Sequence, residues 1–148
     1  MVILNIIIFA SCEPLEKVSD VPEIHFKSYS SFLVDTLDVI IPAGELVLTF
    51  IDGDSDIGLQ DDALNFFLLP YQKLDGEYDS IDAETYGRKY TIGYDEHLDR
   101  SGSTIRGEIK LQIYYFISPP FDTIRYDFYI VDNAGHKSNV ESTTDIAF

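Results

Sequence analysis

The sequence has few of the residues that covalent and redox chemistry use. Its 148 residues include one cysteine, one methionine and no tryptophan. With a single thiol, the chain cannot form an intramolecular disulfide, a cysteine-based zinc site or a redox-active thiol pair. The three histidines are scattered, and no Gly-x-Ser-x-Gly motif of a hydrolase is present. We therefore expect a protein that is not an enzyme.

Basic residues are also scarce. Lys and Arg number 10 against 26 Asp and Glu, which gives a formal net charge of −16 at pH 7. A field of this sign repels phosphate backbones, so nucleic acid is excluded as a partner. Hydrophobic residues nevertheless make up 45% of the chain and aromatic residues 14%, which excludes a disordered polypeptide. The length and the composition predict one globular domain.

No hydrophobic run is long enough to span a bilayer, which takes about 20 apolar residues in a helix. The longest run covers residues 2–10 and is broken only by Asn5. It ends in the small residue Ala10 and is followed by Ser11 and the lone Cys12 before the sequence turns polar. This order predicts an export signal peptide over residues 1–11 and a tether over residues 12–20. The alternative is a buried N-terminal strand with a core cysteine.

The residues before the cysteine favour the export signal. Phe9, Ala10, Ser11 and Cys12 resemble the lipobox of bacterial lipoproteins, in which an apolar residue and two small ones precede a lipidated cysteine. The resemblance implies that Cys12 is diacylated and becomes the mature N-terminus. Two acyl chains would hold the protein stably on a membrane. We therefore expect a lipid-anchored protein of the cell envelope, in the outer membrane, periplasmic or surface-exposed.

The rest of the chain predicts strands and turns. Residues 104–117 and 123–131 alternate apolar and polar side chains, and we expect them to pair as a long antiparallel hairpin. Shorter candidate strands are residues 23–29, 37–41, 45–51, 64–71, 88–94 and 140–146, with turns at 42–44, 74–77 and 100–103. Seven or eight strands without helical periodicity predict an all-β, immunoglobulin-like antiparallel β-sandwich over residues 21–148.

A second motif agrees with this fold. Asp132, Ala134, Gly135 and Ser138 match the pattern Asp-x-Ala-Gly-Asn-x-Ser of bacterial immunoglobulin-like domains, with His136 in place of the Asn. Together with the lipobox, the chain resembles Gram-negative cell-envelope lipoproteins that carry one immunoglobulin-like or cadherin-like sandwich. The resemblance implies an extracytoplasmic interaction module that binds a protein or glycan partner.

The strongest candidate for a binding site is an acidic loop directly after the strand at 45–51. Oxygen ligands for a hard cation such as calcium would come from Asp52, Asp54, Asp56, Gly58, Asp61 and Asp62. The loop is not an EF-hand, because Gly58 falls one position late and Ala63 stands where that motif has its bidentate Glu. We expect an affinity on the order of 10⁻⁴ to 10⁻³ M, as in extracellular modules. The alternative is a solvated turn whose side chains bond local amides.

Tyrosines in the middle of the chain give a second hypothesis. They are Tyr71, Tyr78, Tyr86, Tyr90 and Tyr94. Exposed on a sheet, they would stack on sugar rings, whereas packed inside they would fill the core. The sequence therefore leaves three functions open, which are an interaction module, a carbohydrate-binding lipoprotein and a calcium-stiffened envelope domain.

Overall fold

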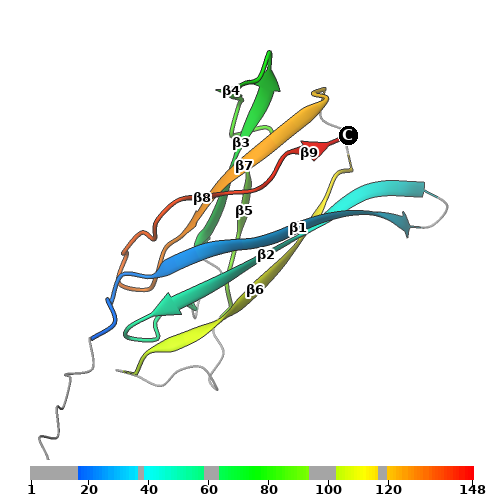
Figure 1. The fold of residues 1–148 in the computed structure, drawn as a ribbon. Helices are drawn as coiled ribbons and strands as arrows, with labels where there is room; N and C mark the ends of the chain where they lie inside the picture. The colour runs from blue at the N-terminus through cyan, green and yellow to red at the C-terminus, as the bar shows by residue number, and fades with distance from the viewer. Residues whose placement is uncertain (1–16, 37–38, 59–63, 94–102, 117–119) are drawn as a thin grey trace, which may run out of the picture.

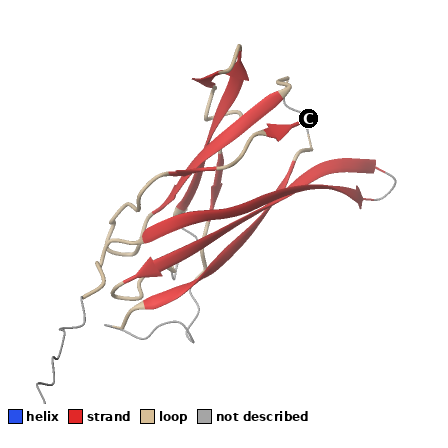
Figure 2. Cartoon of the chain, in the orientation of Figure 1, coloured by secondary structure: helices blue, strands red, loops and turns tan. Residues whose placement is uncertain are grey.

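The computed structural model of the chain is a sandwich of two antiparallel β-sheets (Figures 1 and 2). The structure describes residues 17–36, 39–58, 64–93, 103–116 and 120–148. Within these residues there is no helix, and so none that could cross a membrane. The fold class predicted from the sequence is confirmed.

Nine strands make up the described part of the chain. Their bounds are β1 Glu23–Thr36, β2 Val39–Asp52, β3 Phe66–Leu74, β4 Glu77–Ser80, β5 Arg88–Tyr90, β6 Ile105–Tyr114, β7 Thr123–Ile130, β8 Glu141–Ser142 and β9 Ile146–Ala147. One sheet has the order β1-β2-β6. The other has the order β4-β3-β7-β8, with β5 also paired to β3 and β9 also paired to β7.

The core lies between the two sheets and follows from the alternation within each strand. In β2 the buried positions include Leu46, Leu48 and Phe50, and in β7 every second residue from Ile124 to Ile130 is buried. Successive side chains of a strand point to opposite faces, so each strand contributes one row to the core. Each fully buried side chain of this size contributes about 1.5–3 kcal/mol to the free energy of unfolding.

The predicted hairpin of residues 104–117 with 123–131 is wrong. Both strands form, as β6 and β7, but β6 pairs with β2 and β7 pairs with β3. The two strands therefore belong to different sheets, and the chain crosses the sandwich between them (Figure 1). Alternation shows that a strand has one buried face. Because both sheets of a sandwich bury a face in the same core, alternation does not show to which sheet the strand belongs.

The predicted turn at residues 42–44 is also wrong, because Pro42 and Gly44 lie inside the single long strand β2. Pro42 fits there because it stands at the end of the pairing with β6, where its carbonyl oxygen accepts the Tyr115 N–H at 2.9 Å and no donor from Pro42 is needed. Gly44 serves a close approach, since a Cβ at this position would lie 1.9 Å from the Tyr29 hydroxyl oxygen. By contrast, the predicted turn at 74–77 joins β3 to β4, with positive φ at Asp75 and Gly76.

Candidate metal centre

The first residue of the candidate site, Asp52, is placed by the alternation of β2. It is the last residue of the strand and continues the buried row of Leu46, Leu48 and Phe50. Its side chain is therefore carried inward with the core residues, and the residue is 0% exposed. Burying a carboxylate costs free energy unless a partner compensates the charge.

A second carboxylate, Asp132, is placed in the same way by the opposite sheet. Strand β7 buries every second residue up to Ile130, and the next position in that row is Asp132, which is 3% exposed. Two facing strands from two sheets thus each end their core-facing row in an aspartate. The turn after Asp132 is short, with Gly135 at a φ of 87°.

The loop after β2 brings a third carboxylate, Asp56, to the other two. The Asp56 backbone N–H donates to Oδ2 of Asp52 at 2.9 Å, which folds the loop back over the strand end. Gly53 permits the close approach of the N-terminal segment, because a Cβ there would lie 2.4 Å from the Ser19 carbonyl oxygen. Ser55 adopts a positive φ of 64° in the same loop. The chain just before β1 and the acidic loop therefore pack together.

Backbone donors from the β7–β8 turn fix this loop against the second sheet. The Ala134 N–H donates to Oδ2 of Asp56 at 3.0 Å, and the Asn133 N–H donates to the Asp56 carbonyl oxygen at 3.0 Å. The Asn133 side-chain amide donates to the Gly58 carbonyl oxygen at 2.8 Å. The loop from β2 and the turn after β7 thus form one hydrogen-bonded unit.

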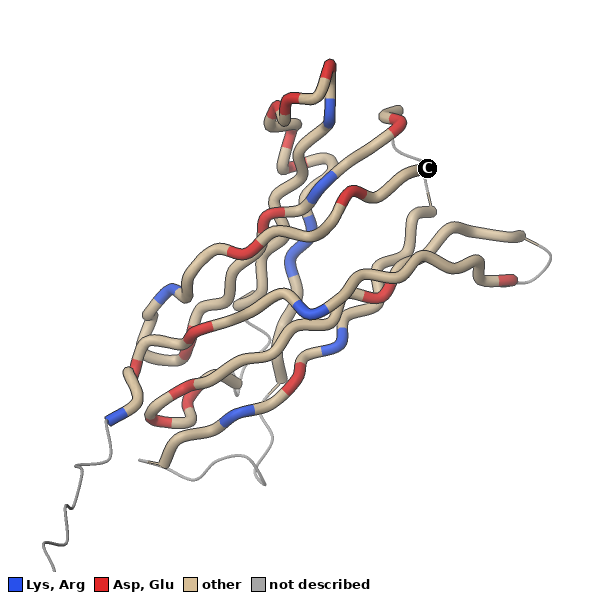
Figure 3. The backbone as a smooth tube through the Cα atoms, viewed as in Figure 1, with Lys and Arg blue, Asp and Glu red and all other residues tan. Residues whose placement is uncertain are grey.

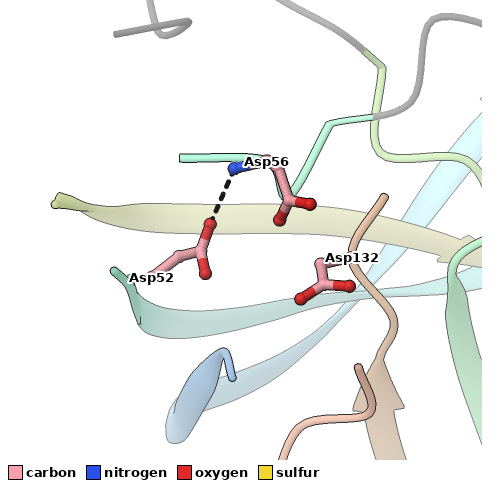
Figure 4. Close-up of side chains that lie close together, drawn as sticks. All are labelled: Asp52, Asp56 and Asp132. Carbon is pink, nitrogen blue, oxygen red and sulfur yellow. Dashed lines mark hydrogen bonds between the residues drawn. The ribbon is translucent and has the colours of Figure 1, made fainter. Parts of the chain in front are cut away.

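Oxygen atoms of Asp52, Asp56 and Asp132 converge in this unit (Figure 4). One carboxylate oxygen from each lies within 4.8 Å of the others. Three buried oxygens nearby, Oδ1 of Asp52, of Asp54 and of Asp56, accept no hydrogen bond in the structure. Buried acceptors are almost always paired, so a set of orphaned anionic oxygens indicates a ligand.

The electrostatics of the cluster agree with this interpretation. Burial raises the pKa of Asp52 to about 6, and repulsion by Asp54 and Asp132 adds to the shift. Burial likewise raises the pKa of Asp56 to about 6, with repulsion by Asp132, Asp54 and Asp52. The backbone hydrogen bonds that Asp52 and Asp56 accept do not offset burial and repulsion, so these two carboxylates still need a compensating positive charge. A bound cation would supply it.

His136 supports Asp132 from the solvent side. Its backbone N–H donates to Oδ1 of Asp132 at 2.7 Å, and its ring Nδ1 lies 2.8 Å from Oδ2. The hydrogen bond to Asp132 and the negative charge of that carboxylate raise the pKa of His136. Because its Nδ1 is engaged with Asp132, His136 serves to orient the carboxylate.

The residues predicted from the sequence fall into three groups. Asp52 and Asp56 lie in the cluster, and Asp54 contributes a buried oxygen and its charge. Gly58 lies at the same place, but its carbonyl oxygen accepts a hydrogen bond from Asn133. Asp61, Asp62 and the lipidation residue Cys12 lie outside the described residues.

The sequence-based set missed Asp132, which is 76 positions or more from Asp52, Asp54 and Asp56 and stands in a motif associated with the fold. A signal for it did exist. Asp132 continues the buried alternation of residues 124–130 by one step, as Asp52 continues that of residues 46–50. An aspartate on the buried parity of a strand is expensive unless it binds something.

The four described tyrosines considered for glycan stacking are half-buried and contact other side chains. The Arg125 guanidinium carbon lies 3.9 Å from the ring centroid of Tyr78 and 5.5 Å from that of Tyr71. Tyr86 makes an edge contact with Phe121, and Tyr90 packs against the core. Tyr94 lies outside the described residues. Each of the four described tyrosines therefore has part of its ring engaged within the protein.

Comparison of the chain with protein-family models, curated proteins and solved structures gives no match. The chemistry and the geometry of the residues therefore carry the functional argument.

Proposed function

We propose that this chain is a non-enzymatic, extracytoplasmic β-sandwich module that binds calcium through Asp52, Asp54, Asp56 and Asp132 and is held on a membrane by a lipid on Cys12. The observation that supports it most is the set of buried carboxylate oxygens that accept no hydrogen bond beside the Asp52, Asp56 and Asp132 cluster. Asp52 gives the strongest support, because it is fully buried and its Oδ1 accepts no hydrogen bond from the described residues.

The donor set selects the type of cation. All the candidate ligands are carboxylate oxygens, which hard cations prefer, whereas zinc and copper sites draw on nitrogen and sulfur. Calcium accepts six to eight oxygens in irregular geometry, so four aspartates completed by water suit it. Magnesium demands a near-ideal octahedron and keeps most of its waters, which suits a buried set of side chains less well.

The position of the site suggests a structural role. Asp52 ends a strand of one sheet, and Asp132 follows a strand of the other. A cation between them would link the two sheets and neutralise the repulsion among the carboxylates. By linkage, a ligand at a hundredfold excess over its dissociation constant raises the free energy of unfolding by about 2.7 kcal/mol.

Location fits this chemistry. Sites of low affinity, with dissociation constants of about 10⁻⁴ to 10⁻³ M, are typical of extracellular modules. The apolar run at residues 2–10 and the following Cys12 supply the expected export signal and lipid anchor. Mass spectrometry of the membrane fraction should find diacylated Cys12 at the N-terminus, and an unmodified thiol on an intact chain would contradict the anchor.

The calcium site is tested by calorimetric titration of the full chain with calcium chloride at neutral pH. We expect one site per chain, which Asp52→Asn abolishes because one buried anionic ligand is lost. Asp79→Asn is the matched control, since it makes the same change at an exposed position of β4. If the parent binds no calcium, or if Asp52→Asn binds as the parent does, the proposed function is wrong.

A further inference from the structure

The end of the sandwich away from the acidic cluster is free of charge over most of its extent. We define this apolar end by four segments, which are residues 28–34, 39–44, 113–116 and 146–148. None of their residues is Asp, Glu, Lys or Arg, although the chain as a whole has 36 of these. Figure 3 shows the result as a tan stretch along the outer part of the β1–β2 hairpin, with one red position near its tip. Asp35 directly follows the first of the four segments in β1.

Large hydrophobic side chains are exposed on this apolar end. It carries six of the ten that are exposed in the described part of the chain, namely Phe32, Leu33, Val39, Ile40, Phe116 and Phe148. Leu33 is 69% exposed and Phe116 is 76% exposed. Contiguous apolar surface of this kind marks an interaction site more often than it marks chance.

A groove of about 320 Å³ opens on the same surface. It is lined mainly by Phe32, Leu33, Pro42, Ala43, Tyr115 and Phe148. The Tyr115 and Phe148 rings meet edge to face at 4.8 Å, and Tyr115 also hydrogen-bonds the Tyr29 hydroxyl at 2.9 Å. The walls are thus fixed by internal contacts, and the groove is preformed.

Strand β1 borders this surface and is an edge strand of its sheet. Its first half is protected, because Ile24 exchanges hydrogen bonds with the Asn139 side chain and the Phe26 N–H donates to Glu141. Lys27, at the bulge, pairs with Glu108. From Ser28 to Val34, β1 pairs with β2 on one side, and no described strand pairs with its other side.

We propose that the open edge of β1 at residues 28–34, together with the adjoining groove, binds an extended, uncharged and apolar peptide segment of a partner protein as an added strand. An unpaired edge offers a row of backbone donors and acceptors, which an extended peptide satisfies. The groove then takes the apolar side chains on one face of that peptide. Because these segments have no charged side chain that could pair with a charge on the peptide, an uncharged strand suits them best.

Two other occupants fit less well. A bilayer provides no hydrogen bonds for the open backbone groups of an edge strand. A second copy would bring together two chains of net charge −16, whose repulsion opposes association. An uncharged peptide satisfies the backbone groups without that repulsion.

The probe is an end-capped peptide of alternating valine and threonine, about nine residues long, which is an ordinary strand length. Binding to the full chain is followed by fluorescence anisotropy, and hydrogen exchange locates the contact. We expect binding, with slower exchange at residues 28–34. A peptide of the same composition with a central proline should bind at least about tenfold more weakly, because proline cannot complete the ladder.

Leu33→Lys is the test variant, because a lysine on an edge strand opposes strand addition. Leu74→Lys is its control, since Leu74 is 51% exposed in the other sheet. We expect Leu33→Lys to weaken binding by about tenfold or more and Leu74→Lys to leave it unchanged, with both variants keeping the far-ultraviolet circular dichroism spectrum of the parent. An unchanged spectrum shows that the variants are folded, and this control does not depend on the calcium site.

The proposal would be overturned by any of four results. These are no binding of the peptide to the parent chain, equal binding of the proline-containing peptide, a concentration-dependent dimer that Leu33→Lys abolishes, and cosedimentation with phosphatidylcholine vesicles that Leu33→Lys abolishes. The third result would assign the apolar end to a second copy, and the fourth would assign it to a lipid surface.

Discussion

The two ends of the sandwich differ in what they leave unsatisfied. At the end where β2 finishes, buried aspartates present anionic oxygens without donors. At the end where β2 begins, large apolar side chains are exposed, and no described strand pairs with the outer edge of β1 at residues 28–34. One 14-residue strand joins both ends, so the same element runs from an apolar surface to an acidic cluster. The unsatisfied groups of the first end are those that a cation would bind, and those of the second end are the ones that the proposed neutral strand would cover.

The largest expected effect is the loss of calcium-dependent stability when a ligand of the acidic end is replaced. In excess calcium, the parent should gain about 2.7 kcal/mol in free energy of unfolding at a hundredfold excess over the dissociation constant. Asp132→Asn should lose this gain, because the ligand from the second sheet is removed. In chelator the variant should be at least as stable as the parent, since repulsion within the cluster falls. Urea unfolding with calcium and with chelator measures both effects.

A destabilised variant that keeps the full calcium gain would show that Asp132 is structural and not a ligand. Asp79→Asn serves again as the exposed control.

The next effect concerns the apolar end. Gly44→Ala should cost about 1–3 kcal/mol, the usual range for overpacking, because its Cβ would collide with the Tyr29 side chain. Gly93→Ala is the control, as a Cβ there meets nothing within 4 Å. Because the change lies far from the cluster, the cost should be the same in calcium and in chelator. A cost that disappears in calcium would mean that the two ends are coupled.

A smaller effect distinguishes the ends by pH. The folded pKa of Asp52 and of Asp56 is raised to about 6 from 3.8, so the folded protein binds more protons than the unfolded chain between these values. In chelator, stability should therefore fall as the pH rises from about 4 to about 7, by on the order of 1–2 kcal/mol after solvent screening. Saturating calcium should remove this loss, because it binds the ionised form.

Thermal unfolding across this pH range measures the effect, and Asp52→Asn should flatten the curve in chelator. If stability falls equally with pH in the parent and in Asp52→Asn, then Asp52 does not contribute to the pH dependence.

The smallest expected effect is a change in calcium affinity when the side chain of His136 is removed. His136→Ala should weaken calcium binding by about tenfold or less, because Asp132 loses the ring contact but keeps the backbone donor of residue 136. Stability in chelator should change little, since the side chain is 44% exposed. Calorimetry shows the difference, and an unchanged affinity would mean that the ring does not hold the carboxylate in place.

Much of the fold could be predicted from the sequence because alternation is a local property. The strands near residues 104–117 and 123–131 were found within a few residues, and so was the Asp75–Gly76 turn. Pairing was not predictable in the same way. Strands β6 and β7 are neighbours in sequence, yet both sheets share one core, so their patterns do not tell which strand lies beside which.

Predictions from local sequence also failed where a residue far away in the sequence determines the structure. Pro42 and Gly44 have the composition of a turn, but Gly44 is required by the ring of Tyr29 lying over it. Likewise, the acidic loop was visible in the sequence, whereas Asp132 joins it only through the packing of the two sheets. Extending the buried alternation of residues 124–130 by one more step would have found Asp132, just as the same step after Phe50 leads to Asp52.

Hydrogen exchange of the full chain with calcium and with chelator tests the account most directly. We predict that calcium slows exchange in residues 53–58 and 131–136, which the cation would join, and leaves residues 28–34 unchanged. Calcium that changes neither region, or that changes both equally, would contradict a cation site confined to the acidic end of the sandwich.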